Sequence, residues 1–145
     1  MTMILAAMIA ALSLQGRATP APAWTWALYE GDMVTLANEI PDTPHLRTTF
    51  ECAPGSSVAR MTLYGGAPSA NGMTQVSAGQ SNATVAVSEG ARGADVLAVR
   101  TDHPVFAAFA TSGQMSIRAG DVGVTVVVEA DHLAKLRRFA ELCAG

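Results

Sequence analysis

The chain has 145 residues and a mass of 15.0 kDa, which is the size of a single domain. Half of the residues are hydrophobic, 14% are charged and the mean hydropathy is +0.27, a composition that excludes an intrinsically disordered chain. The formal net charge is −3, the only lysine is Lys135, and the arginines are scattered along the chain. Because binding to nucleic-acid phosphates needs clustered basic side chains, we expect no nucleic-acid partner.

An uncharged, apolar segment at residues 4–14 precedes a spacer rich in Pro and Ala at residues 15–23. The apolar segment is shorter than the about 20 residues that a membrane-spanning helix needs, and it is typical of a secretory signal peptide. Ala21 and Ala23 supply the small–x–small pattern that precedes cleavage. We therefore expect a signal peptide at 1–23, one domain at 24–145, no stable membrane anchor after cleavage, and a periplasmic or secreted location. The alternative is a buried N-terminal helix, which the prolines of the spacer disfavour.

After the spacer, alternating apolar and polar residues predict a domain made mostly of strands. The turn at residues 53–56 joins two of these strands, 46–52 and 59–64, in a predicted hairpin. A further strand begins at Met115. The other predicted strands span residues 24–29, 33–38, 73–77, 83–88, 95–100 and 122–129.

Two helices complete the predicted elements. Asp102 is expected to cap the first helix, with Pro104 in its first turn and Gly113 at its C-terminal end. Asp131 is expected to cap the second, whose polar face, including Lys135, is expected to meet water. The buried stripe of the second helix is predicted to contain Leu133, Leu136, Phe139, Ala140 and Cys143. The predicted fold class is α+β and mainly β: an antiparallel sandwich or partial barrel, with a short helix and a C-terminal helix packed on it.

The chain has two cysteines, Cys52 and Cys143. An even count in an exported chain predicts one disulfide, and the alternative is two buried free thiols. Cys52 falls on the inward face of a predicted strand, and Cys143 falls on the buried stripe of the second helix. The two periodicities therefore place both sulfurs in one core.

The polar residues form no recognised catalytic or metal-binding motif. The three histidines are His45, His103 and His132; the first follows Pro44 in a loop, and the others follow the expected capping aspartates. The sequence contains no Gly-x-Ser-x-Gly elbow, Cys-x-x-Cys pair or His-Glu-x-x-His motif. We expect no catalytic site, metal or cofactor, and a small hydrolase that uses a histidine outside known motifs is the alternative.

Trp24 and Trp26 are the strongest side-chain candidates for binding. They share one face of a predicted strand, where two indoles could contact a ligand or a partner. The alternative, which we favour, is that this face fills the core, because a buried Trp removes much apolar area from water.

Two resemblances follow from these elements. Trp24, the strand that ends in residues 49–52, the Phe-containing helix at 104–109 and the final helix at 136–143 occur in an order that resembles small exported proteobacterial proteins. Some of those proteins are associated with type VI secretion. The resemblance implies a β-rich exported domain that is closed from first element to last by a disulfide.

Residues 50–58 resemble the opening strand of periplasmic inhibitors of C-type lysozyme, and residues 88–93 are similar to their inhibitory loop. In that family a serine and an arginine of the loop enter the lysozyme cleft, so the resemblance implies that Ser88 and Arg92 are contact residues. Gly93 stands where that family has an aromatic residue. An ordinary hairpin turn is the alternative.

The expected function is therefore that of a non-enzymatic exported domain which binds another envelope component. Inhibition of a lysozyme-type or other periplasmic hydrolase is the second hypothesis, and a small hydrolase is the third.

Overall fold

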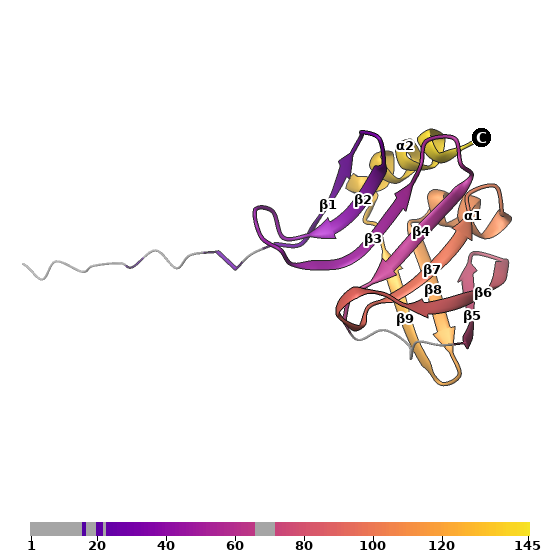
Figure 1. Cartoon of the computed structure of the whole chain (residues 1–145). Coiled ribbons are helices and arrows are strands. Elements are labelled where there is room, and N and C mark those ends of the chain that lie inside the picture. The colour runs from indigo at the N-terminus through magenta and orange to yellow at the C-terminus, as the bar shows by residue number, and fades with distance from the viewer. Residues whose placement is uncertain (1–15, 17–19, 22, 66–71) are drawn as a thin grey trace, which may run out of the picture.

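The computed structural model describes residues 16, 20, 21, 23–65 and 72–145 (Figure 1). The predicted signal-peptide segment at 4–14 lies outside the described residues. No helix in the described part of the chain has the length and apolar character of a membrane-spanning segment.

The first four strands form an antiparallel meander in which each strand pairs with the next. They are β1 (Thr25–Tyr29), β2 (Val34–Glu39), β3 (Leu46–Cys52) and β4 (Val58–Leu63). The predicted hairpin is confirmed: Phe50 of β3 lies opposite Met61 of β4. Polar and apolar residues alternate in both strands, so one face of the meander is apolar and turns toward the core.

Five further strands extend the sheet, and two helices lie on it. The remaining elements are β5 (Gly72–Ala78), β6 (Ser81–Glu89), β7 (Asp95–Arg100), α1 (Pro104–Ser112), β8 (Gln114–Ala119), β9 (Val122–Val127) and α2 (Leu133–Cys143). The order across the sheet is β1-β2-β3-β4-β7-β6-β5-β8-β9. The sheet curls into a half-barrel (Figure 1), which confirms the predicted class and identifies the partial barrel as the arrangement present.

The core lies between the concave face of the sheet and the two helices. Phe50 is at its centre, with its ring centroid 5.4 Å from that of Phe109 and 6.1 Å from that of Phe139. All three rings are fully buried. Helix α1 packs against β5, β6 and β8, and α2 packs against β1 and β2. The apolar stripe predicted for the last helix is thus the surface that joins it to the sheet.

The predicted disulfide is present. Cys52 at the end of β3 and Cys143 at the end of α2 are bonded, with their Cα atoms 5.9 Å apart. Both residues are buried. The bond fixes the last helix to the centre of the meander.

The two helix starts differ from the predictions. The Asp102 carboxylate binds Arg100 instead of capping α1, and His103 Nδ1 accepts a hydrogen bond from the Val105 N–H at 3.1 Å. The planar guanidinium offers Asp102 two charged donors, which a helix end does not. Asp131 likewise does not cap α2, because it lies within the short 3-10 turn Ala130–His132 that precedes the helix.

The outermost strands of the sheet, β1 and β9, are not paired with each other, and we name the place where side chains connect this part of the fold the seam. The Trp26 indole Nε1–H donates to Val127 O at 3.0 Å, and Lys135 Nζ of α2 donates to Trp26 O at 2.7 Å. Lys135 was expected to face water, but its long side chain reaches back to the strand instead. These two contacts occupy backbone oxygens that would otherwise be left unpaired at the edges.

Candidate functional site

The two tryptophans have different environments. Trp26 is 2% exposed, and its ring centroid lies 6.2 Å from that of Phe50. Trp24 lies before β1 and is half-buried, with the Arg47 guanidinium carbon 4.0 Å from its ring centroid. Trp26 is therefore a core residue, which agrees with the core-filling role favoured from the sequence. Trp24 is the tryptophan that reaches the surface.

The segment from Ser88 to Gly93 forms the end of β6 and the turn into β7. Ser88 is exposed and pairs with Val96 across the strands. Arg92 is exposed at the tip of the turn and has a left-handed backbone conformation, with φ 59° and ψ 29°. A left-handed conformation is uncommon for a residue with a side chain, and such positions are enriched at functional sites.

The base of this turn is held by tight packing. The Gly90 N–H donates to Ala94 O at 2.6 Å, and a Cβ at Gly90 would come within 2.7 Å of Val96 Cγ2. These contacts fix the two ends of the turn that exposes Arg92.

Arg92 lies at one end of the sheet together with three residues from other segments. His45 precedes β3, Arg47 lies near its start, and Tyr64 follows β4. We name these four residues, His45, Arg47, Tyr64 and Arg92, the basic end.

Two cavities that share Tyr64 and Gly65 open at the basic end. One, of about 220 Å³, is lined by His45, Tyr64 and Arg92 together with Pro44, Leu46 and Gly65. The other, of about 300 Å³, lies between the β3–β4 pair and β9. Its lining residues are Arg47, Thr48, Leu63, Tyr64, Gly65, Val124, Thr125 and Val126. Among the described residues, neither lining contains a carboxylate, and each lining contains one arginine.

Strand order explains why these residues meet. Neighbouring antiparallel strands run in opposite directions, so the start of β3, the end of β4 and the start of β7 lie at the same end of the sheet. Sequence reasoning singled out Trp24 and Arg92 but missed His45, Arg47 and Tyr64 as their neighbours. The predicted β3–β4 hairpin already places Tyr64 beside Arg47, whose C=O accepts from the Tyr64 N–H at 2.9 Å. The missing signal is the β4–β7 pairing that brings Arg92 to them, which no local pattern encodes.

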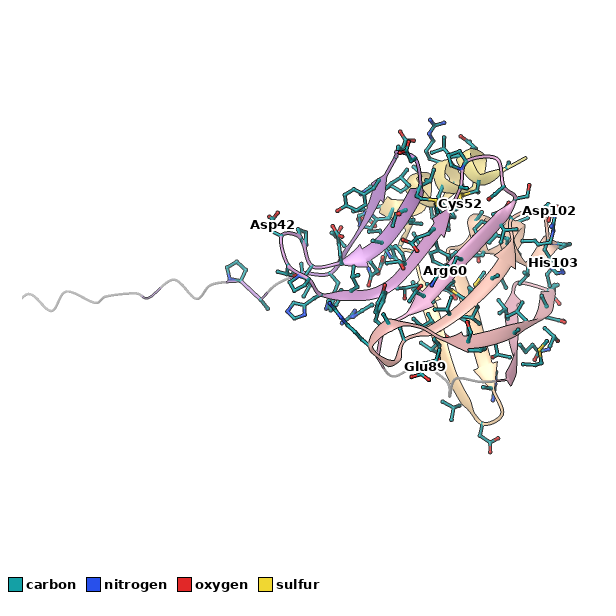
Figure 2. All side chains as sticks on the ribbon, viewed as in Figure 1. Asp42, Cys52, Arg60, Glu89, Asp102 and His103 are labelled. Atoms are coloured by element: carbon teal, nitrogen blue, oxygen red, sulfur yellow. A yellow bond between two sulfur atoms is a disulfide. The ribbon has the colours of Figure 1, made fainter. Side chains whose placement is uncertain are left out.

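Two acidic residues lie at the base of the same turn. Asp95 is buried and lies opposite Glu89. Burial, with a smaller contribution from the Glu89 charge, raises the pKa of Asp95 above its usual value. Figure 2 shows Glu89 near this turn, whereas Asp102 and His103 lie at the other end of β7.

The three histidines lie in separate places. His45 belongs to the basic end, the His103 ring caps α1, and His132 Nε2 lies 3.4 Å from Thr25 Oγ1 and 3.8 Å from Asp131 Oδ2. Within the residues that the structure describes, no three His, Cys, Asp or Glu side chains are grouped as metal ligands would be.

The basic end combines charged donors with aromatic surface. Two guanidinium groups can form paired hydrogen bonds with carboxylates, and Trp24 and Tyr64 add aromatic surface next to them. Arginine and aromatic residues are the types enriched at the centres of protein interfaces. No family model, curated protein or solved structure matches the chain.

Proposed function

We propose that the protein is a non-enzymatic, exported binding domain that recognises an acidic surface of another envelope protein through the basic end. The observation that carries the proposal is the convergence of Arg47 and Arg92 around two adjoining cavities, with no carboxylate among the described lining residues. Trp24 supports it, because the indole stacks on Arg47 and holds that guanidinium at the surface.

Export is supported by the buried Cys52–Cys143 disulfide, since structural disulfides persist in oxidising compartments. The mass of the intact protein from its host, alkylated without reduction, tests this step. A mass equal to residues 24–145 less two hydrogens is the expected result. A full-length mass with two alkylated thiols would contradict export.

The binding proposal is tested by crosslinking inside the producing cell. A photoreactive phenylalanine analogue replaces Tyr64, which lines both cavities, and in a control it replaces the exposed Val122 of β9. We expect one discrete adduct from position 64 and none from position 122. Arg47→Ala and Arg92→Ala should each reduce the adduct, whereas the control Arg118→Ala on β8 should not. No adduct at position 64, or equal adducts at both positions, would contradict the proposal.

Inhibition of a C-type lysozyme is a second candidate, favoured by the exposed Arg92 at the tip of a tightly packed turn that also carries the exposed Ser88. Micromolar protein should then slow cell-wall hydrolysis by the lysozyme, and Arg92→Ala should restore the rate while Arg118→Ala does not. Hydrolysis that proceeds at the same rate with and without the protein would remove this candidate.

A further inference from the structure

Strands β6 and β7 separate as they leave the turn that joins them. They pair at three positions next to the turn, and the last pair is Val87 opposite Leu97. Beyond it, residues 81–86 of β6 pair only with β5, and residues 98–100 of β7 pair only with β4. Figure 1 shows the two strands diverging from the turn.

The hydrogen-bond pattern shows which backbone groups face this gap. In antiparallel strands, alternate residues direct their N–H and C=O to the same neighbour. Gly90 N–H donates to Ala94 O at 2.6 Å, so the even-numbered residues of β6 and β7 point toward each other. On the other side of β7, Thr101 N–H donates to Ser57 O at 3.0 Å, which directs the odd-numbered residues toward β4.

In the existing pairs, each step back along β6 is matched by one step forward along β7. If the pairing continued in this register, Thr84 would lie opposite Arg100. Arg100 O is used, because it accepts from the His103 N–H at 3.2 Å. The N–H and C=O of Thr84 and the N–H of Arg100 face the gap. In the described parts of the chain, no side-chain or loop hydrogen bond uses these three groups.

A cavity of about 300 Å³ occupies the gap. It is lined by Ala83, Thr84 and Val85 of β6, by Ala98, Val99 and Arg100 of β7, and by His103. The His103 Nδ1 accepts from Val105 N–H, so its proton lies on Nε2 and the ring offers a donor. The charge of Arg100 is balanced by Asp102, whose carboxylate oxygens lie 2.8 and 2.6 Å from its Nε and Nη2.

We propose that this gap binds an extended, uncharged peptide segment of a partner protein, which pairs with β6 as an added strand. Asn82, two residues before Thr84 on β6, directs its N–H and C=O to the same side, and an extended polypeptide is the ligand whose donors and acceptors match this two-residue repeat. The gap lies away from the basic end, so it forms a second contact surface that does not depend on the first.

The test uses a capped, uncharged pentapeptide of alternating threonine and valine, titrated into the purified, isotope-labelled protein and followed by nuclear magnetic resonance. We expect saturable shifts of the Thr84 and Arg100 amide signals below about 1 mM peptide, and exchange of these amides slowed by about tenfold. The fully N-methylated peptide has the same sequence but no backbone N–H donors, and it should not bind.

Two proline variants provide the matched protein control. Thr84→Pro removes an N–H that faces the gap, so the protein should fold and bind the peptide at least about tenfold more weakly. Val85→Pro removes an N–H directed at β5 and should destabilise the fold. Absence of shifts at Thr84 and Arg100, or equal binding of the N-methylated peptide, would overturn the proposal whether or not the variants fold.

Discussion

The half-barrel has two seams, one without strand pairing and one where strand pairing stops, and their polar groups are satisfied differently. Between the unpaired strands β1 and β9, the Trp26 indole donates to Val127 O at 3.0 Å, and Lys135 of α2 donates to Trp26 O at 2.7 Å. Between β6 and β7, pairing stops at Val87 and Leu97, and a cavity of about 300 Å³ follows.

The difference lies in the length of the side chains. Trp26 and Lys135 are long and end in donors that reach the backbone, whereas Ala83, Val85 and Ala98 beside the second gap are short and apolar. The long side chains there have other partners, since Arg100 binds Asp102 and the His103 ring caps α1. Buried backbone groups need partners, so the first seam can belong to the interior of the fold. At the second seam, the backbone N–H and C=O groups that face the gap can bind water or a ligand. One seam therefore stabilises the fold, and the other, inside the sheet, is the place where we propose that a partner binds.

The largest expected effect is at the closed seam. Trp26→Ala removes a core side chain and the donor to Val127, and we expect a loss of about 3–5 kcal/mol in the free energy of unfolding. Trp24→Ala is the control, and its loss should be about 1 kcal/mol or less, because only the stacking with Arg47 is removed. Urea denaturation followed by circular dichroism measures both. Equal losses would show that the seam is not held by Trp26.

The disulfide supports the same seam, because it anchors the helix that carries Lys135. Replacing Cys52 and Cys143 together by Ala should lower the free energy of unfolding by about 2–5 kcal/mol. The wild-type protein in reducing buffer should unfold at the same urea concentration as the double variant. A double variant as stable as the oxidised wild-type protein would contradict this role.

Lys135→Met keeps the apolar stem over the seam but removes the hydrogen bond to Trp26 O. We expect a loss of about 1 kcal/mol. Arg137→Met, on an exposed position of the same helix, should change stability by about 0.5 kcal/mol or less. If the two variants behave alike in thermal unfolding, the Lys135 contact does not stabilise the seam.

A pair of engineered cysteines distinguishes an open seam from a closed one. Thr84→Cys with Arg100→Cys should stay unbridged under oxidation, because the diverging strands hold these positions too far apart for a disulfide. Ser88→Cys with Val96→Cys is the matched control on the paired part of the same strands and should crosslink more readily. Peptide mapping by mass spectrometry reads the result. Efficient bridging of positions 84 and 100 would mean that the gap closes in solution.

The smallest expected effect is a pH dependence at the paired base of the β6–β7 turn. An acid whose pKa is raised by folding binds protons more readily in the folded state, so stability increases as the pH falls through that pKa. Wild-type protein should therefore gain stability relative to Asp95→Asn as the pH is lowered from neutrality toward the ordinary aspartate pKa of about 4. Glu89→Gln should reduce the gain, since the Glu89 charge contributes to the raised pKa. Parallel stability curves for wild type and Asp95→Asn would contradict the assignment.

Local patterns in the sequence predicted much of the fold. The alternation at residues 46–52 and 95–100 gave the bounds of β3 and β7, and Pro104 and Gly113 bracket α1 as expected. The disulfide followed from two independent periodicities. Each of these features depends on residues that are close in the chain.

What sequence reasoning missed depends on residues that are distant in the chain. Nothing local in β4 shows that its second neighbour is β7, so neither the basic end nor the β6–β7 gap could be assembled from patterns. The predicted Asp102 cap failed for a different, local reason: Arg100 binds the Asp102 carboxylate, and the neighbouring His103 ring accepts the hydrogen bond from the helix end. Several residues next to a helix start can compete for its cap, and propensity alone does not decide between them.

The order of strands also has a consequence for the speed of folding. The β1–β4 meander and the β5–β6 and β8–β9 hairpins join neighbours in the chain, so each can form early and alone. The β4–β7 pairing forms later, because β5 and β6 lie between these two strands in the chain but not in the sheet. The β5–β6 hairpin must therefore move out of the way before β4 and β7 can pair. Chains whose contacts are dominated by such distant pairings fold in milliseconds to seconds instead of microseconds. Until β4 and β7 have paired, one edge of β4 is exposed, and this partly folded state is the species most prone to aggregation.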